Sequence, residues 1–305
     1  MSGMMRVYVA MVAAMVFWGM SFIWSKVVFR LYHPLSTIFL RLLLASVVLL
    51  LWGWWRGRLQ RPGRGDWRPI ALMSLFQPCL YFLGENMGLS LVSPTIAAVM
   101  VGTIPVFSML AGVWWRHERL GVFNVVGMAV SFLGVFLVIA GPGMVVQASV
   151  PGLLWLFLAV CSAVGYAMTV TRLTGRYNVY SLVTYQNLLG VLGFLPLVLW
   201  FSPRDLMVVP DGQVLLALVQ LSLLASSLAF MLFTYGMHHL GMGRANAFSN
   251  LIPVFTALIS SLFFGERLLW FNIVGVTLTV SGLFAVQLRR KESAAPVQSQ
   301  RGTSR

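Results

Sequence analysis

The order of the helices in this protein is decided by one stretch of sequence that occurs twice. The sequence IPVF stands at residues 104–107 and again at 252–255, and ERL stands at 118–120 and again at 266–268. Between residues 104–127 and 252–275, twelve of 24 positions are identical at a constant offset of 148. Shared apolar composition produces stray leucine and valine matches, but not matched proline, Glu-Arg and Phe-Asn together. The chain is therefore interpreted as two copies of one unit.

Apolar runs separated by turn residues or charges divide the chain into ten segments, five in each copy. A membrane span needs roughly 20 mostly apolar residues, and each run has about that length. The runs lie at 7–30, 35–55, 69–91, 94–115, 121–141, 151–172, 180–201, 213–237, 244–264 and 268–288. Five is an odd number, so the second copy enters the membrane from the opposite side.

The fold class predicted from this pattern is an all-α integral membrane protein with ten transmembrane helices arranged as two inverted five-helix repeats. We expect the first repeat at residues 1–145 and the second at 146–291. The polar residues 292–305 are predicted to form a disordered cytoplasmic tail. Inverted repeats are typical of transporters that bind substrate near the midplane between the copies.

The composition excludes several other classes of protein. Of 305 residues, 59% are hydrophobic and 9% are charged, whereas soluble domains are about 25% charged. The net charge of +14 does not indicate nucleic-acid binding, because the basic residues form no continuous face. Cys79 and Cys161 stand far apart in apolar runs and suggest neither a disulfide framework nor a metal site.

The basic residues instead predict the orientation in the membrane. Sixteen of the 21 Lys and Arg residues fall in one set of alternate segments, three in the other set and two inside runs. Positive charge accumulates on the cytoplasmic side of membrane proteins. Both termini are therefore expected in the cytoplasm.

Residues of the first, fourth, fifth and tenth runs resemble a known family. They are the sequence FWG at 17–19 followed by SF at 21–22, Pro105, the two ERL elements, and Gly127 with Gly134. With the duplication, these residues resemble the drug/metabolite transporter superfamily, and within it the EamA-type permeases of bacteria, over residues 8–288. The resemblance implies a multi-pass protein of the bacterial inner membrane. It also implies a secondary transporter that commonly exports amino acids, with runs one to four and six to nine lining a central cavity. The residues that precede each glutamate differ, RH at 116–117 against FG at 264–265.

Three charged residues lie inside apolar runs, where each costs about 2.5–3.5 kcal/mol on insertion scales. They are Lys26, Arg41 and Glu85, which all fall in the outer half of their runs. One hypothesis is a polar cluster in which Glu85 pairs with Lys26 or Arg41, leaving a positive charge for a substrate carboxylate. The alternative is that the long basic side chains reach the membrane surface. The repeat places Phe233 opposite Glu85, so Glu85 could carry a proton on one side only.

Pro105 and Pro253 interrupt the fourth and ninth runs at matched positions. A proline within a helix leaves backbone carbonyls without their hydrogen bonds. Within a membrane, such carbonyls are tolerated only where they face protein or a water-filled cavity. Nearby polar residues are Thr103, Asn246, Ser249 and Asn250, which either line the substrate path or hold helices together. With them, the candidate substrate-binding residues are Trp18, Ser21, Arg41, Gln77, Tyr81, Glu85, Thr103, Tyr166, Asn246 and Asn250. Glu118 and Glu266 are interpreted as helix-capping or ion-pair elements.

These observations favour a secondary active transporter that exports amino acids or related small metabolites by alternating access. An exchanger of phosphorylated or anionic metabolites is the alternative, with Lys26, Arg41 and Arg172 as phosphate ligands. No metalloprotease or serine-hydrolase motif occurs, so an enzyme is not predicted. No cofactor is expected, the partners are a small-molecule substrate and the lipid bilayer, and proton coupling and a homodimer are left open.

Overall fold

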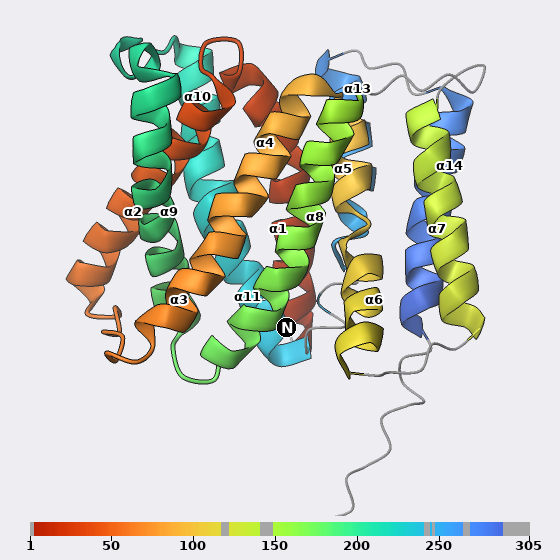
Figure 1. Ribbon diagram of the computed structural model, residues 1–305, viewed down its shortest axis with the longest axis horizontal. Coiled ribbons are helices and arrows are strands. Elements are labelled where there is room, and N and C mark those ends of the chain that lie inside the picture. Colours follow the sequence, from red (N-terminus) through yellow and green to blue (C-terminus); the bar gives the residue numbers. More distant parts are fainter. Residues whose placement is uncertain are drawn as a thin grey trace, which may run out of the picture.

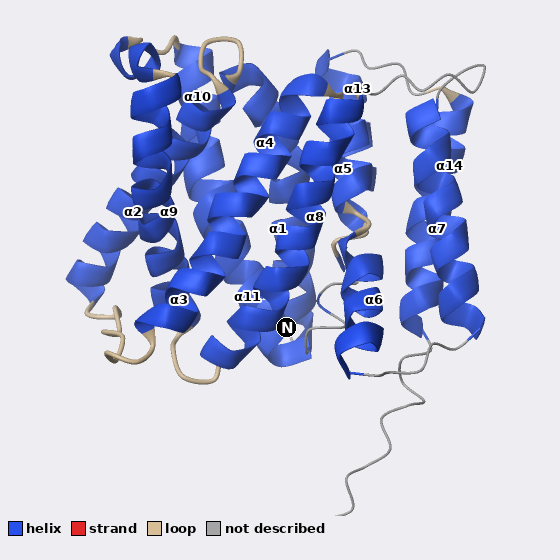
Figure 2. Cartoon of the chain, in the orientation of Figure 1, coloured by secondary structure: helices blue, strands red, loops and turns tan. Residues whose placement is uncertain are grey.

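The computed structural model describes residues 3–116, 122–140, 149–240, 245, 248–264 and 269–288. Within these ranges the chain is built of helices and contains no strand. The helices stand side by side (Figure 1), and short loops join their ends (Figure 2). Several residues of the sequence analysis lie outside the described residues: Glu118, Asn246, Glu266 and the tail 292–305.

Each apolar run predicted from the sequence coincides with helical structure. The first repeat contains α1 (Gly3–Val28), α2 (Pro34–Arg56), α3 (Trp67–Ser74), η1 (Leu75–Leu80), α4 (Tyr81–Leu91), α5 (Pro94–Val101), α6 (Ile104–Arg116) and α7 (Val122–Ala140). The second contains α8 (Val150–Leu173), α9 (Val179–Phe201), η3 (Pro203–Met207), α10 (Gly212–Gln220), η4 (Leu221–Leu228), α11 (Ala229–Leu240), α13 (Leu251–Phe264) and α14 (Trp270–Leu288).

By length and composition, six helical stretches of the described chain qualify as membrane spans. They are Gly3–Val28, Pro34–Arg56, Pro94–Ala111, Val150–Val170, Val179–Phe201 and Gly212–Leu240. Three further apolar helices are shorter, at Val125–Val138, Leu251–Phe263 and Trp270–Gly282. Six of the ten predicted spans therefore qualify on their own, and the count of ten stays a prediction.

Helix starts follow local sequence signals. Pro34 and Pro94 occupy the first turns of α2 and α5, where a missing backbone N–H costs nothing. At the start of α9, the Asn178 side chain accepts a hydrogen bond from the backbone N–H of Ser181, and Asp211 caps α10 in the same manner. These caps fix where the helices begin.

Helices α7 and α14 pack tightly against each other at one edge of the bundle (Figure 1). A Cβ atom at Gly134 would lie 2.4 Å from the backbone nitrogen of Thr279, and one at Gly282 would lie 2.5 Å from that of Ser131. Gly134 and Gly282 are 148 positions apart, as are Ser131 and Thr279. The same contact thus occurs twice, in opposite chain directions, so the two equivalent helices run antiparallel as an inverted repeat requires.

The third helical stretch of each repeat contains a π-helical segment at an equivalent place. An offset of 148 carries η1 onto residues 223–228, which lie within η4. In η1 the backbone of Gln77 leaves the helical region, with φ −146° and ψ 117°, immediately before Pro78. Wide turns of this kind bend helices and are frequent at functional sites.

Helices α2 and α9 also run antiparallel and are joined by hydrogen bonds at both ends. Just before α2 begins, the Tyr32 hydroxyl donates a hydrogen bond to the carbonyl of Val208 at 2.8 Å. In the first turn of α2, the Ser36 hydroxyl lies 2.7 Å from the hydroxyl of Ser202, which follows α9. Burial, and secondarily the carboxylate of Asp205, raise the pKa of Tyr32. The Tyr32 phenol therefore remains a proton donor at neutral pH.

At the opposite end, the loop after α2 is held against the start of α9. Arg176 forms an ion pair with Asp66 at 3.0 Å, and the Tyr177 hydroxyl donates to the same carboxylate at 2.7 Å. The side chain of Gln60 accepts from the backbone N–H of Asn178 at 2.6 Å. Contacts at both ends make α2 and α9 a single structural unit.

Candidate functional site

A cavity of about 800 Å³, including its open mouth, lies between the two repeats. The wall is formed by α1, α2, η1, α4, α5 and α6 of the first repeat, and by α8, α11, α13 and Ser249 of the second. Helices α7, α9 and α14 contribute no lining residue among the described part of the chain.

The cavity brings together seven of the ten candidates chosen from the sequence: Trp18, Ser21, Arg41, Gln77, Tyr81, Glu85 and Tyr166. Thr103 is buried behind the wall, where its hydroxyl donates to the carbonyl of Met100 at 2.6 Å. Asn250 is fully buried and is not a lining residue. Asn246 lies outside the described residues.

The sequence analysis did not identify the apolar part of the wall, although the repeat carries a signal for it. Five pairs of lining residues are separated by 148 positions: Trp18 and Tyr166, Phe82 and Phe230, Glu85 and Phe233, Val101 and Ser249, and Ile104 and Ile252. The cavity therefore surrounds the axis that relates the two repeats. Its polar groups are unequally divided, because Phe233 takes the place of Glu85.

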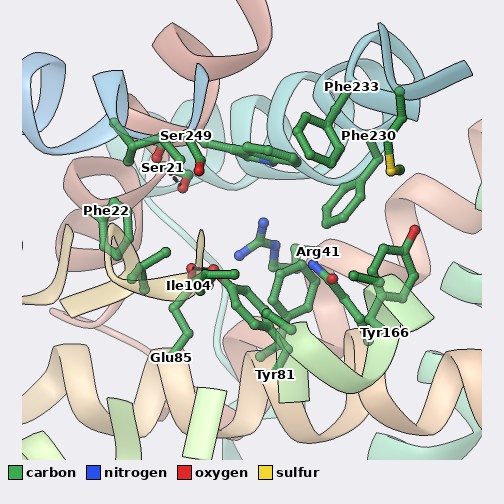
Figure 3. Close-up of a pocket in the computed structure, with 18 residues that line it drawn as sticks. Ser21, Phe22, Arg41, Tyr81, Glu85, Ile104, Tyr166, Phe230, Phe233 and Ser249 are labelled. Atoms are coloured by element: carbon green, nitrogen blue, oxygen red, sulfur yellow. Dashed lines mark hydrogen bonds between the residues drawn. The ribbon is translucent and has the colours of Figure 1, made fainter. Parts of the chain in front are cut away.

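Arg41 is the central polar group of the cavity. Only 1% of its surface is exposed, yet it lines the cavity, and Figure 3 shows its guanidinium group in the middle of the space. Its Nε donates a hydrogen bond to the Ser226 hydroxyl at 2.8 Å. The guanidinium carbon lies 4.2 Å from the centre of the Phe82 ring. The buried Nη1 has no hydrogen-bond partner in the described structure.

Glu85 is the acidic residue of the cavity wall. One carboxylate oxygen accepts a hydrogen bond from the Tyr81 hydroxyl at 2.9 Å, one turn earlier on α4. The other oxygen lies 3.5 Å from the side-chain nitrogen of Asn86. Among the described residues, Glu85 and Arg41 form no ion pair, and Lys26 does not line the cavity. The hypothesis of an ion pair is therefore not confirmed: Glu85 accepts a hydrogen bond from Tyr81, and Arg41 donates one to Ser226.

Gln77 reaches the cavity because of the bend in η1. Its extended backbone breaks the helix there, and its side chain is 7% exposed. No hydrogen bond of the Gln77 carboxamide is formed within the described residues. The bend thus presents an unoccupied amide donor and acceptor to the cavity.

Aromatic side chains form the wall on the side of the second repeat. Trp18 packs against Phe230 and Phe233, with ring centres 5.1 and 5.0 Å apart. Its indole N–H donates to the carbonyl of Ala225 in η4 at 3.3 Å. Tyr166 donates its hydroxyl to Gln186 at 3.2 Å. Trp18 and Tyr166 therefore present mainly their apolar faces to the cavity.

Near the start of the two copies the alignment offset is 146 positions, which places Arg172 opposite Lys26, and a one-residue gap places Gln186 opposite Arg41. Gln186 stands where the repeat aligns it with Arg41, and it is buried on α9 outside the lining. The side chain of Arg172, the equivalent of Lys26, lies outside the described residues. Within the described ranges, no group of three His, Cys, Asp or Glu residues could hold a metal ion.

Comparison with known proteins decides the family. A family model described as the EamA-like transporter family matches residues 5–140 and again residues 150–288. The chain belongs to the EamA-like transporter family. It is thus a multi-pass membrane transporter, which implies a small-molecule substrate and a lipid environment.

Transporters of other organisms are similar to the chain over nearly its whole length. An uncharacterized transporter of Archaeoglobus fulgidus is 24% identical over 297 residues, covering 94% of this chain and 99% of the relative. A probable terminal-alkyne amino-acid exporter of Streptantibioticus cattleyicolor is 25% identical over 292 residues, covering 94% of this chain and 96% of the relative.

A solved crystal structure shares the fold of this EamA-like chain. The TM-score is 0.69 at 20% sequence identity, and the match covers 94% of this chain and 99% of the other. At this identity the likeness concerns the fold alone. The arrangement of the helices is therefore one that a crystal structure has already shown.

Proposed function

We propose that this transporter is a secondary active exporter of amino acids or related small metabolites. It works by alternating access across a bacterial inner membrane, with both termini in the cytoplasm. The observation that carries this proposal is that Arg41 lines the cavity while its buried Nη1 has no hydrogen-bond partner among the described residues. The two repeats, expected at residues 1–145 and 146–291, alternately open the cavity to each side.

A buried guanidinium group without an anion is unfavourable, because desolvation of the charge is not compensated. Nε of Arg41 is satisfied by Ser226, and Nη1 remains free to donate. Arginine binds carboxylates through two parallel N–H groups more strongly than neutral acceptors. A substrate carboxylate is therefore the group that best completes the site.

The rest of the cavity suits an apolar substrate side chain. The walls contributed by Phe22, Phe230, Phe233 and Met237 are hydrophobic, and burying apolar surface stabilises binding by about 25 cal/mol per Å². A carboxylate head with an apolar tail describes a hydrophobic amino acid. The name of the relative from Streptantibioticus cattleyicolor, an amino-acid exporter, supports the same class.

Glu85 provides the coupling to protons in this proposal. An ionised Glu85 can bind either a substrate ammonium group or a proton, but not both. Competition for one carboxylate links outward release of the amino acid to inward return of a proton. Since Phe233 stands at the equivalent position, one acidic group is available for this exchange in the described wall.

The alternative, exchange of phosphorylated metabolites, is less well supported. A phosphate group carries close to two charges and is usually bound by several cationic groups. Arg41 is the one Lys or Arg residue among the described cavity-lining residues. One guanidinium matches a carboxylate better than a phosphate.

The proposal is tested with inside-out membrane vesicles that contain the transporter and have an acidic interior. We expect radiolabelled L-leucine to accumulate inside, because export from the cell corresponds to uptake into these vesicles. Collapse of the proton gradient should abolish the accumulation. Accumulation of glucose 6-phosphate without leucine would support the alternative, and vesicles without the transporter provide the control.

A further inference from the structure

We infer that Ser226 is a positioning residue that aims Arg41 at the substrate and thereby sets the preference for a carboxylate. This inference rests on the proposed function, in which Arg41 binds the substrate anion. It assigns a specificity role to a side chain of the second repeat that does not line the cavity itself.

The contacts of Arg41 determine the direction of its guanidinium group. The hydrogen bond from Nε to the Ser226 hydroxyl, 2.8 Å long, fixes the inner edge of the planar group. The Phe82 ring, 4.2 Å from the guanidinium carbon, covers one face. Because the group is rigid and planar, an anchored edge and a covered face fix the orientation in which Arg41 lines the cavity.

Ser226 is itself held firmly. It is completely buried, and its backbone carbonyl accepts a hydrogen bond from the Asn187 side chain at 3.1 Å. It lies in η4, whose wide turn replaces a regular α-helical turn at this level of the helix. A fixed hydroxyl at a bend is suited to orient a neighbouring long side chain.

The hydrogen-bonded pair of Arg41 and Ser226 has no equivalent at the corresponding positions of the other repeat, although both helices that carry the pair have one. The repeat aligns Arg41 with Gln186 on α9, and aligns Ser226 with Pro78 in η1. The equivalent helices do touch, because a Cβ atom at Gly190 would lie 2.4 Å from Pro78. That contact is apolar. The pairing of arginine and serine therefore belongs to one side of the cavity and orients the substrate within it.

The arginine and the serine come from different repeats. Arg41 lies on α2 of the first repeat and Ser226 lies in η4 of the second. The anion-binding group is thus oriented across the interface between the two repeats. Loss of the hydroxyl leaves Nε without its acceptor and releases the guanidinium from its fixed direction.

The experiment measures the affinities of the purified transporter in nanodiscs for L-leucine and for L-leucinamide, by isothermal titration calorimetry. Ser226→Ala is expected to reduce the preference for leucine over leucinamide about tenfold, through weaker binding of leucine alone. The control is Ser227→Ala, the next residue in η4, whose hydroxyl donates to Ser222 within the same helix at 2.9 Å. Ser227→Ala should keep the preference within about twofold.

Two further variants separate the possible failures. Ser226→Thr retains a hydroxyl and should retain the preference, and Ser226→Cys, a weak acceptor, replaces the alanine variant if that variant does not fold. If Arg41→Gln loses the preference but Ser226→Ala keeps it, the positioning role is overturned and the proposed function stands. If the native transporter shows no preference for leucine, the proposed function is overturned and this inference with it.

Discussion

Arg41 and Phe82 face each other across 4.2 Å, and this contact distinguishes two phenylalanines that the repeat makes equivalent. Phe82 and Phe230 are 148 positions apart, both line the cavity, and their ring centres are 6.2 Å apart. Phe82 lies under the guanidinium group, whereas Phe230 packs on Trp18. Phe82 thus lies at the charged part of the cavity, and Phe230 lies in its aromatic wall.

Replacement of Phe82 tests this division. A cation over an aromatic face in a desolvated site gains about 2 kcal/mol. We expect Phe82→Leu to weaken binding of L-leucine at least about tenfold and to leave L-leucinamide nearly unchanged. The control Phe230→Leu should weaken both ligands equally. Equal effects of Phe82→Leu on the two ligands would show that the ring does not act through Arg41.

Replacement of Glu85 tests the coupling. As the pH falls, protons occupy the carboxylate of the native transporter, so its affinity for the substrate ammonium group should fall. Glu85→Gln cannot bind a proton, and we expect substrate binding and exchange by this variant to be independent of pH. The measurement is leucine exchange in proteoliposomes over a range of pH, with Glu85→Asp as the variant that keeps the dependence. A pH profile of Glu85→Gln identical to that of the native protein would remove Glu85 from coupling.

Asn250 and Asn187 are two buried asparagines whose replacement by leucine should affect the stability of the protein in different ways. Both are buried, but neither side-chain amide atom of Asn250 has a partner among the described residues, whereas Asn187 donates to Ser226. An unsatisfied buried amide costs roughly 1–3 kcal/mol. We expect Asn250→Leu to maintain or raise the Tm and Asn187→Leu to lower it. A large fall in Tm for Asn250→Leu would show that its amide is hydrogen-bonded.

The α2–α9 unit is expected to move as one body during transport. One of its ends is joined at Ser36 and Ser202, whose hydroxyl oxygens are 2.7 Å apart. A disulfide between Ser36→Cys and Ser202→Cys, in a protein with Cys79 and Cys161 replaced by alanine, should therefore leave leucine exchange intact. The single variant Ser36→Cys under the same oxidation is the control. Loss of exchange on oxidation of the pair would mean that α2 and α9 separate.

The sequence predicted the helical arrangement well because it depends on features repeated along the chain. The shared IPVF element and the apolar runs correspond to the helices, and the constant offset between the copies corresponds to the antiparallel pairing of α7 with α14. The π-helical segments were not foreseen. Pro78 marks η1, but η4 contains no proline or glycine, and its wide turn depends on tertiary contacts such as the bond from Trp18 to Ala225.

The polar part of the candidate site was predictable because a charge within an apolar run is rare. Arg41 and Glu85 were found for this reason. The hydrogen-bond partners of their side chains were not predicted, because the position of a residue in an apolar run indicates its depth in the membrane but not which side chain it contacts. The aromatic wall gave no comparable signal, since 21 phenylalanines are spread along the chain. Ser226 carried no signal either, because its role depends on a helix bend that brings it to Arg41.

The most direct test of the account is the affinity of Arg41→Gln for L-leucine and L-leucinamide, measured by isothermal titration calorimetry on folded protein. The substitution preserves a hydrogen-bonding side chain but removes the charge. We expect leucine binding to weaken at least about tenfold while leucinamide binding stays within about twofold. Native affinity of a folded Arg41→Gln variant for leucine would contradict the claim that this arginine binds the substrate carboxylate.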